Sequence, residues 1–365
     1  MGAWSAGSDC TVTTVALVGG GTAGHITPLL AVAEQLAGRA TCLVWGTKGG
    51  REAELVDDLP IVHSIPKLPF PRGLSLKALV FPFRLLMAVW ATRASFVRHR
   101  VDVVVGFGGY TAAAAYLAAR MAGIPMVIHE ANAVPGLANR LGAALGGTVG
   151  ICFPETPIRH EAVVGMPLRD SIVSLERASL RSAARRHFGL RPRKPVLLVT
   201  GGSTGAVRIN STVDEVAADI VKAGWQILHL RGPGNPAEKR EKDVVSVEYT
   251  DRMDLALSAA DLAVSRAGAT TVNELQVVGL PAVFIPYHVG NGEQEKNAAE
   301  TVRAGGALLV SQEEFTPQWV RQTLIPLLQD VPQVESMAKA MSGLGRRDGA
   351  RVIAQWALDA GVKSA

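Results

Sequence analysis

The sequence predicts an α/β protein built from two Rossmann-like domains that face each other across a cleft. Short, β-branched apolar runs alternate with Ala- and Leu-rich helical stretches, a pattern typical of buried parallel strands connected by helices. A strand followed by a glycine-rich turn and a helix start also occurs twice, at Val15–His25 and at Leu197–Val207. Because such a unit opens a nucleotide-binding fold, each repeat marks the first strand of a domain.

Length and composition agree with two globular domains. The chain has 365 residues, of which 48% are hydrophobic and 19% are charged, so disorder and low-complexity architectures are excluded. The three cysteines, Cys10, Cys42 and Cys152, are too few for a disulfide framework or a thiolate zinc site and indicate a reducing compartment. The sequence shows neither a signal peptide nor an uncharged apolar run of about 18 residues, so no membrane-spanning segment is expected.

The elements of both sheets are assigned from apolar runs and helical periodicity. Buried strands are expected at Thr13–Val18, Thr41–Trp45, Val101–Val105, Met126–His129, Val196–Thr200, Gln226–Leu230, Leu262–Ser265 and Pro281–Ile285. Helices are expected at Pro28–Ala37, Tyr110–Ala122, Val207–Ala223, Thr271–Val278 and Glu293–Ala304. Strand–helix–strand units of this kind form open sheets that are covered on both faces.

The two domains are expected at residues 1–164 and 195–344. The linker between them, 165–194, contains an arginine-rich helical stretch, Leu175–Arg186, and the breaker Pro192, and a second breaker, Pro195, follows directly after it. The last segment, 345–365, contains a helix at Ala350–Ala360. This helix could pack back on the N-terminal domain or stay with the C-terminal one.

A cationic apolar segment stands out in the first half of the chain. No acidic residue occurs from Leu59 to Val101, and apolar side chains at helical spacing lie among basic residues. Either the segment is an amphipathic core helix, or it is an interfacial membrane patch. The exclusion of acids favours an anionic membrane surface. Pro82 is expected to break or start the helix there.

The glycine turns suit a phosphate ligand. Gly19, Gly21 and Gly24 match the dinucleotide fingerprint. The dinucleotide interpretation also needs an acid at the end of the second strand, but Leu43–Thr47 contains none. The turn at Gly201–Gly205 offers a second phosphate cradle. Neither turn is followed by the Lys and Ser or Thr of a P-loop, which excludes that class of nucleotide-binding protein.

Ordered motifs across nearly the whole chain resemble the MurG family of bacterial N-acetylglucosaminyltransferases. They are GGGTAGHITP (Gly19–Pro28), GFGGY (Gly106–Tyr110), HEANAVPGLANR (His129–Arg140), GGSTGA (Gly201–Ala206), SRAGATTVNEL (Ser265–Leu275) and GNGEQEKNA (Gly290–Ala298). The resemblance implies the GT-B glycosyltransferase fold. It also implies transfer of N-acetylglucosamine from its UDP conjugate to the muramoyl C4 hydroxyl of lipid I, giving lipid II, by a peripheral enzyme at the cytoplasmic face of the cell membrane.

The resemblance places the donor in the C-terminal domain. It implies that Glu274 holds the ribose hydroxyls, that Arg266 contacts the nucleotide, and that Glu293 and Gln294 contact the sugar hydroxyls. The other donor contacts implied by matching motif positions are Arg169, Ser203, Thr250, Met253, Ala269, Thr270 and Thr271.

The acceptor side falls in the N-terminal domain. His25 follows the first glycine turn, and an imidazole can take up a proton near neutral pH. Glu130, at a strand end, is the second candidate general base, and the sequence does not choose between the two. The remaining acceptor contacts implied by the resemblance are Thr22, Tyr110, His129, Asn132 and Asn139.

The expected mechanism is a single in-line displacement at the anomeric carbon with inversion. No Asp-x-Asp metal motif occurs, so no metal or other cofactor is expected to be required. The expected partners are UDP-N-acetylglucosamine, lipid I and an anionic membrane surface, with no nucleic acid. Two positions depart from the family pattern: Met166 replaces an expected asparagine, and Glu293 replaces glutamine or histidine.

Two alternative functions remain open on the sequence. One is a glycosyltransferase of a soluble natural product or a UDP-sugar epimerase, and neither needs a basic apolar patch. The other is a nucleotide-sugar-binding protein without catalytic activity. The retention of His25, Glu130 and Glu274 argues against the binding protein.

Overall fold

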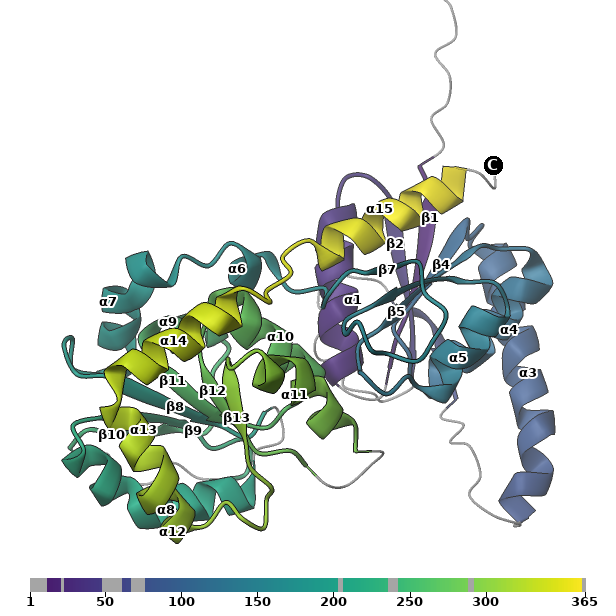
Figure 1. Ribbon diagram of the computed structural model, residues 1–365. Coiled ribbons are helices and arrows are strands. Elements are labelled where there is room, and N and C mark those ends of the chain that lie inside the picture. The colour runs from purple at the N-terminus through teal and green to yellow at the C-terminus, as the bar shows by residue number, and fades with distance from the viewer. Residues whose placement is uncertain are drawn as a thin grey trace, which may run out of the picture.

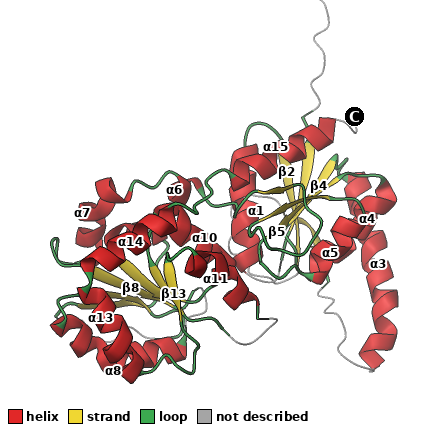
Figure 2. Ribbon diagram, viewed as in Figure 1, coloured by secondary structure: helices red, strands yellow, loops and turns green. Residues whose placement is uncertain are grey.

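The computed structural model describes residues 12–20, 23–47, 61–66, 76–202, 206–235, 242–287 and 292–362. In this part of the chain, two parallel β-sheets lie in two separate units, each with helices on both faces of its sheet (Figures 1 and 2). This arrangement confirms the predicted fold class.

The N-terminal sheet has seven strands in the order β3-β2-β1-β4-β5-β6-β7, and all neighbouring pairs are parallel. The strands are β1 (Thr14–Val18), β2 (Thr41–Thr47), β3 (Ile61–Ile65), β4 (Val103–Gly106), β5 (Met126–Glu130), β6 (Thr148–Ile151) and β7 (Ala162–Val163). The central strands β1, β4 and β5 consist mostly of buried apolar residues, as expected for strands covered on both faces.

Alternating side chains of these strands enter two different cores. Val15 and Leu17 pack with the helices α1 (Ala23–Leu36) and α15 (Gly349–Val362). Ala16 and Val18 pack on the opposite face. That face is covered by α3 (Leu76–Arg98), α4 (Tyr110–Ala122) and α5 (Leu137–Ala144). The final helix of the chain is therefore part of the N-terminal unit (Figure 1).

The C-terminal sheet has six strands in the order β10-β9-β8-β11-β12-β13, again all parallel. They are β8 (Val196–Thr200), β9 (Gln226–Leu230), β10 (Val244–Val247), β11 (Leu262–Ser265), β12 (Ala282–Phe284) and β13 (Ala307–Leu309). One face is covered by α8 (Val207–Lys222), α12 (Pro317–Trp319), a π-helical turn (Val320–Leu324) and α13 (Ile325–Gln329). The other face is covered by α6 (Asp170–Val173), α7 (Arg177–Phe188), α9 (Met253–Ala259), α10 (Ala269–Val278) and α11 (Glu293–Arg303). Helix α14 (Val331–Ser342) contributes a side chain to each core.

The strand order places a crevice at the same point in both sheets. In each sheet the first strand is central, and the connections leave in opposite directions from it. Ligands of open α/β sheets bind at this switch point, outside the carboxyl ends of the strands. Because Val18 pairs with Gly106, the first glycine turn starts beside Phe107–Tyr110. The pairing of Thr200 with Ser265 brings the start of the second turn, Gly201, beside the segment that leads into α10 in the same way.

The chain passes from one unit to the other twice, once near Gly165 and once near Gly349. These two segments lie in contact with each other. Gly165 has a φ of +77°, and a Cβ there would lie 2.7 Å from the Arg346 side chain. A Cβ at Gly349 would lie 2.9 Å from the Val164 carbonyl oxygen. The linker helix α7 belongs to the C-terminal unit, because the Arg177 guanidinium donates hydrogen bonds to four carbonyl oxygens there, those of Leu257, Ala260, Val278 and Gly279.

Two proline predictions were wrong. Pro82 neither breaks nor starts a helix; it lies inside α3. Pro28, expected as the first residue of its helix, lies inside α1, which begins at Ala23. In both helices the proline lies beyond the first turn and removes one intrahelical hydrogen bond. Burial of apolar residues further along each helix, such as Phe96 in α3, outweighs that loss.

Candidate active site

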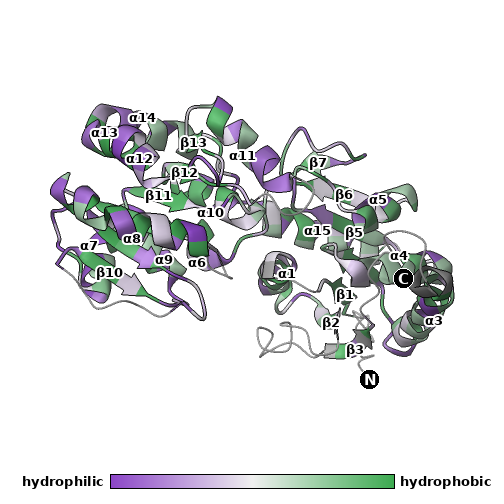
Figure 3. Cartoon of the chain, turned by 90° about the horizontal axis from the view of Figure 1, so that it is seen from below, coloured by the Kyte–Doolittle hydropathy of each residue, from purple (hydrophilic) through white to green (hydrophobic). Residues whose placement is uncertain are grey.

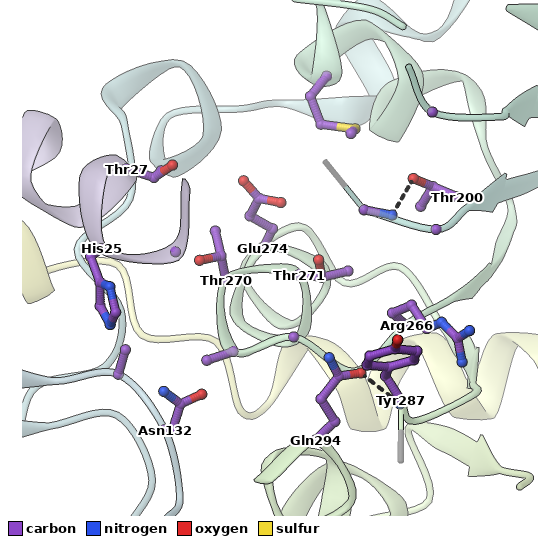
Figure 4. A pocket seen from close by; sticks show the side chains of 18 of the residues that line it. His25, Thr27, Asn132, Thr200, Arg266, Thr270, Thr271, Glu274, Tyr287 and Gln294 are labelled. Carbon is purple, nitrogen blue, oxygen red and sulfur yellow. Dashed lines mark hydrogen bonds between the residues drawn. The ribbon is translucent and has the colours of Figure 1, made fainter. Parts of the chain in front are cut away.

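A cavity of about 1570 Å³ lies between the two units, at the carboxyl ends of both sheets. Its lining comes from the ends of β4 and β5 and from α1 on one side. On the other side it comes from the ends of β8, β9, β10 and β11 and from the first turns of α8, α10 and α11. Figure 4 shows His25 and Asn132 on one side of this cavity and Arg266 on the opposite side.

His25 lies in the first turn of α1 and lines the cavity. Its Nδ1 atom is 3.2 Å from the carbonyl oxygen of Gly20. Since a carbonyl oxygen only accepts hydrogen bonds, Nδ1 carries the proton, and the lone pair of the neutral ring lies on Nε2. The Gly20 contact therefore selects the tautomer that a general base needs.

Two glycines allow the backbone to lie against this histidine. Gly108 and Gly109 have φ values of +90° and +84°. A Cβ on Gly109 would lie 2.7 Å from the Gly20 oxygen, and one on Gly108 would lie 3.5 Å from His25 Nε2. The GFGGY motif thus serves close packing around the imidazole. Tyr110, which follows directly, is half exposed and lines the cavity.

Glu130 ends β5 with a carboxylate that is only 3% exposed. Its Oε1 accepts a hydrogen bond from the N–H of Asn132, and its Oε2 accepts from the N–H of Gly136 and from Asn139 Nδ2, each at 2.9 Å. Burial raises the pKa of Glu130, although these three donors oppose the rise. Both oxygens hold the β5–α5 loop in place, so the geometry favours His25 over Glu130 as the general base.

The position of His129 does not match the predicted acceptor contact. The side chain is fully buried, does not line the cavity, and donates from Nε2 to the Gly165 carbonyl at 3.0 Å. Burial lowers its pKa to about 4. Successive residues of a strand face opposite sides, so only Glu130 of the adjacent pair points to the cavity, and His129 ties β5 to the linker.

The first turn of α10 forms the centre of the C-terminal wall. Ala269, Thr270 and Thr271 line the cavity there, and the N-terminus of a helix favours a bound anion. Glu274 lies one turn further on and also lines the cavity. Burial raises the pKa of Glu274 to about 7, and the positive charge of Arg169 opposes this rise.

Arg266 lines the cavity, but its guanidinium is occupied by protein groups. Nη1 donates to the carbonyls of Ile285 and Pro286, at 3.1 and 3.2 Å, and Nη2 donates to Gln312. The guanidinium also lies over the Tyr287 ring, 5.2 Å from its centroid. The arrangement indicates that Arg266 fixes the segment after β12 as one wall of the cavity.

The sugar-contacting pair predicted from the sequence lies at the start of α11. Glu293 and Gln294 both line the cavity, and Gln294 Oε1 accepts a hydrogen bond from the N–H of Tyr287 at 3.0 Å (Figure 4). Burial raises the pKa of Glu293. The acid that replaces glutamine or histidine here therefore lies in a poorly solvated position.

The cavity brings together most of the predicted site residues. Those that line it are His25, Tyr110, Glu130, Asn132, Asn139, Arg169, Thr250, Met253, Arg266, Ala269, Thr270, Thr271, Glu274, Glu293 and Gln294. Thr22 and Ser203 lie outside the described residues. Sequence reasoning missed Tyr249 and Arg208, which also line the cavity. Tyr249 is 63% exposed, and its place beside Thr250 was the available signal.

Two parallel-sheet units with a cavity between them are an architecture found in two-domain glycosyltransferases, and two family models assign the chain to that class. Residues 15–150 match the N-terminal domain of glycosyltransferase family 28, and residues 196–353 match the C-terminal domain of that family. The crystal structure of Acinetobacter baumannii MurG has a TM-score of 0.77 and is 28% identical. The match covers 95% of this chain and 99% of that one.

The names of two relatives specify one kind of glycosyltransferase. The UDP-N-acetylglucosamine–N-acetylmuramyl-(pentapeptide) pyrophosphoryl-undecaprenol N-acetylglucosamine transferase of Clavibacter sepedonicus is 49% identical over 96% of this chain and 97% of its own. The enzyme of the same name from a Nocardioides species is 46% identical, over 96% and 99%. The chain belongs to the MurG family of glycosyltransferase family 28.

Because Glu130 holds the β5–α5 loop, its replacement should lower the stability of the protein. Replacement of a residue that acted only as a general base would not have this effect. Glu130→Gln replaces one acceptor oxygen by an NH₂ group that faces N–H donors, and we expect the free energy of unfolding to fall by about 1–3 kcal/mol. His25→Ala should change it by much less. Urea denaturation of both variants checks this, and equal stability of Glu130→Gln and wild type would contradict the assigned role.

Proposed function

We propose that this chain transfers N-acetylglucosamine from UDP-N-acetylglucosamine to the C4 hydroxyl of the muramoyl sugar of lipid I, which gives lipid II. The observation that carries the proposal is that one cavity has His25 on one wall and the α10 N-terminus and Glu274 on the other. The close relatives with this named activity support it, and they favour it over an epimerase or a natural-product glycosyltransferase.

The residues divide the reaction between the two walls. His25 Nε2 takes the proton of the C4 hydroxyl of the muramoyl sugar. At the same time, the oxygen of that hydroxyl forms a bond to the anomeric carbon of N-acetylglucosamine. The bond from that carbon to the diphosphate oxygen breaks on the opposite side, so the configuration inverts. The departing UDP carries the negative charge, which the first turn of α10 and Arg169 stabilise. Glu274 accepts hydrogen bonds from the ribose hydroxyls.

Because these groups belong to the protein, we propose that the transfer requires no metal ion. Purified protein with UDP-N-acetylglucosamine and a short-chain lipid I analogue should release UDP and form the disaccharide. The rate should stay within about twofold of its original value after treatment with EDTA. Absence of product from folded protein that binds UDP would contradict the assignment. Loss of activity on chelation, restored by Mg²⁺, would overturn the metal-free mechanism alone.

His25 gives the sharpest test of the acceptor wall. His25→Ala should lower kcat by about a hundredfold or more, because proton transfer from the acceptor hydroxyl is lost. UDP affinity should be nearly unchanged, since UDP contacts the opposite wall. Steady-state kinetics and calorimetry measure the two quantities. Unchanged turnover would remove His25 from catalysis.

Glu274 predicts a pH dependence of donor binding. Its pKa of about 7 means that the carboxylate gains a proton as the pH falls through 7, and a protonated acid is a weaker acceptor for two ribose hydroxyls. Affinity for UDP-N-acetylglucosamine should therefore fall between about pH 8 and pH 6. Glu274→Gln should bind weakly at every pH. Calorimetry is used because it measures donor binding directly, whereas turnover also depends on His25. If the affinity of the wild-type protein did not change with pH, the role of Glu274 in ribose binding would be contradicted.

Helix α3 supports docking on an anionic membrane surface. It lies at the outer edge of the N-terminal unit, away from the C-terminal one (Figures 1 and 3). From Val80 to Arg98 it is long and apolar enough to cross a membrane by length and composition. Its inner side, which includes Val89 and Phe96, is buried. The outer apolar side chains, each more than half exposed, are Phe83, Leu86, Met87, Trp90 and Val97.

We therefore propose a peripheral enzyme at the cytoplasmic face of the membrane, with the outer side of α3 in the lipid interface. The double variant Arg84→Ala/Arg93→Ala should bind anionic vesicles about tenfold more weakly. The control Arg186→Ala/Arg193→Ala removes two exposed charges from the C-terminal unit and should bind like wild type. Vesicle sedimentation measures both, and an equal effect of the two variants would contradict the α3 surface.

A further inference from the structure

Asn297 connects the two units from inside their interface. It lies in α11 and is fully buried. Its Oδ1 accepts a hydrogen bond from the N–H of Ala133 at 2.8 Å, and its Nδ2 donates to Asn132 Oδ1 at 3.2 Å. Nδ2 also lies 3.3 Å from the Ala267 carbonyl, after β11. A carboxamide both donates and accepts, so one side chain joins α11, the loop after β11 and the N-terminal unit.

The N-terminal partners of Asn297 lie in the loop that Glu130 holds. Asn132 donates its own N–H to Glu130 Oε1, and Gly136 donates to Oε2. The loop is therefore fixed to the end of β5 on one side and to α11 on the other. Asn132 itself lines the cavity, so its orientation depends on both attachments.

The C-terminal side of the connection is the helix that begins with the predicted sugar contacts. Glu293 and Gln294 line the cavity one turn before Asn297. Residues one turn apart on a helix keep a fixed relation. A change in the Asn297 contact therefore shifts this pair relative to Asn132.

We propose that Asn297 is a positioning residue that couples the donor-sugar contacts of α11 to the acceptor-side loop. The proposal rests on the transferase function proposed above. The cavity then has its complete sugar-binding wall only when the two units are in contact, and Asn297 makes the buried part of that contact beside Asn132. It contributes to transfer through Asn132, Glu293 and Gln294 rather than by touching the reacting atoms.

A second link on the same helix gives a matched control. Arg303, at the end of α11, pairs with Glu155 of the N-terminal unit at 3.0 Å, but both side chains are more than 60% exposed. Exposed pairs of this kind contribute little. Arg303 does not line the cavity. Comparison of variants at Arg303 and Asn297 therefore distinguishes the effect of loosening the units in general from the effect of losing the specific connection at the sugar site.

The test compares Asn297→Ala, Asn297→Asp and Arg303→Ala in the full-length protein. Both Asn297 variants should lower kcat/KM by about tenfold or more, and the aspartate also places a carboxylate oxygen beside the Asn132 and Ala267 oxygens. UDP affinity should stay within about twofold, because UDP lacks the sugar that α11 contacts. Arg303→Ala should keep kcat/KM within about twofold.

The position of the two units is measured separately, by spin-label distances with and without UDP-N-acetylglucosamine. Asn297→Ala should widen the distance in the bound state, and Arg303→Ala should not. Retained kcat/KM in Asn297→Ala, an equal loss of UDP affinity, or an equal loss in Arg303→Ala would each overturn the proposal. If wild type lacks transferase activity, the proposed function fails, and the distances still decide whether Asn297 couples the units. Should Asn297→Ala not fold, Asn297→Ser is measured with the same expectations.

Discussion

The site depends on one geometric constraint: its working groups stand where parallel strands end. Parallel strands expose unpaired backbone and short loops at their carboxyl edge, and each sheet offers one such edge at its switch point. Neither edge alone encloses a ligand. Glu130 ends β5 on one side, and Thr200 ends β8 on the other. The active site therefore forms only where the crevices of the two units face each other. Any displacement of one unit changes the distances between the groups on the two walls.

The sequence was informative where local rules decide the structure. Val196–Thr200, Gln226–Leu230 and Leu262–Ser265 are strands with the predicted bounds, because a short, mostly apolar run is typical of a strand that is covered on both faces of a parallel sheet. The short outer strands β7 and β13 carried no such signal, since they are short and partly exposed. Pro28 misled the prediction because burial of the rest of α1 outweighs a single lost hydrogen bond.

The site residues were predicted from family motifs more than from local rules. A motif does not say which way a side chain points, so some of these predictions matched the geometry and others did not. Motif positions line the cavity when they lie at strand ends or near the start of the helices that follow. His129 does not, because a strand turns adjacent side chains to opposite sides. Alternation along β5 alone could have separated it from Glu130. The Asn297 contacts join residues more than 160 positions apart, and only the placement of one unit on the other reveals them.

The return of α15 to the first unit has a consequence for synthesis of the chain. Ile353, Ala354 and Ala357 fill the core beside β1, so the half that is translated first lacks part of its interior until α15 leaves the ribosome. Among the described residues, the cores of the second half contain no residue of α15. During translation the first half therefore exposes apolar surface for longest, and a nascent chain stalled before α15 should depend on chaperones more than the folded protein does.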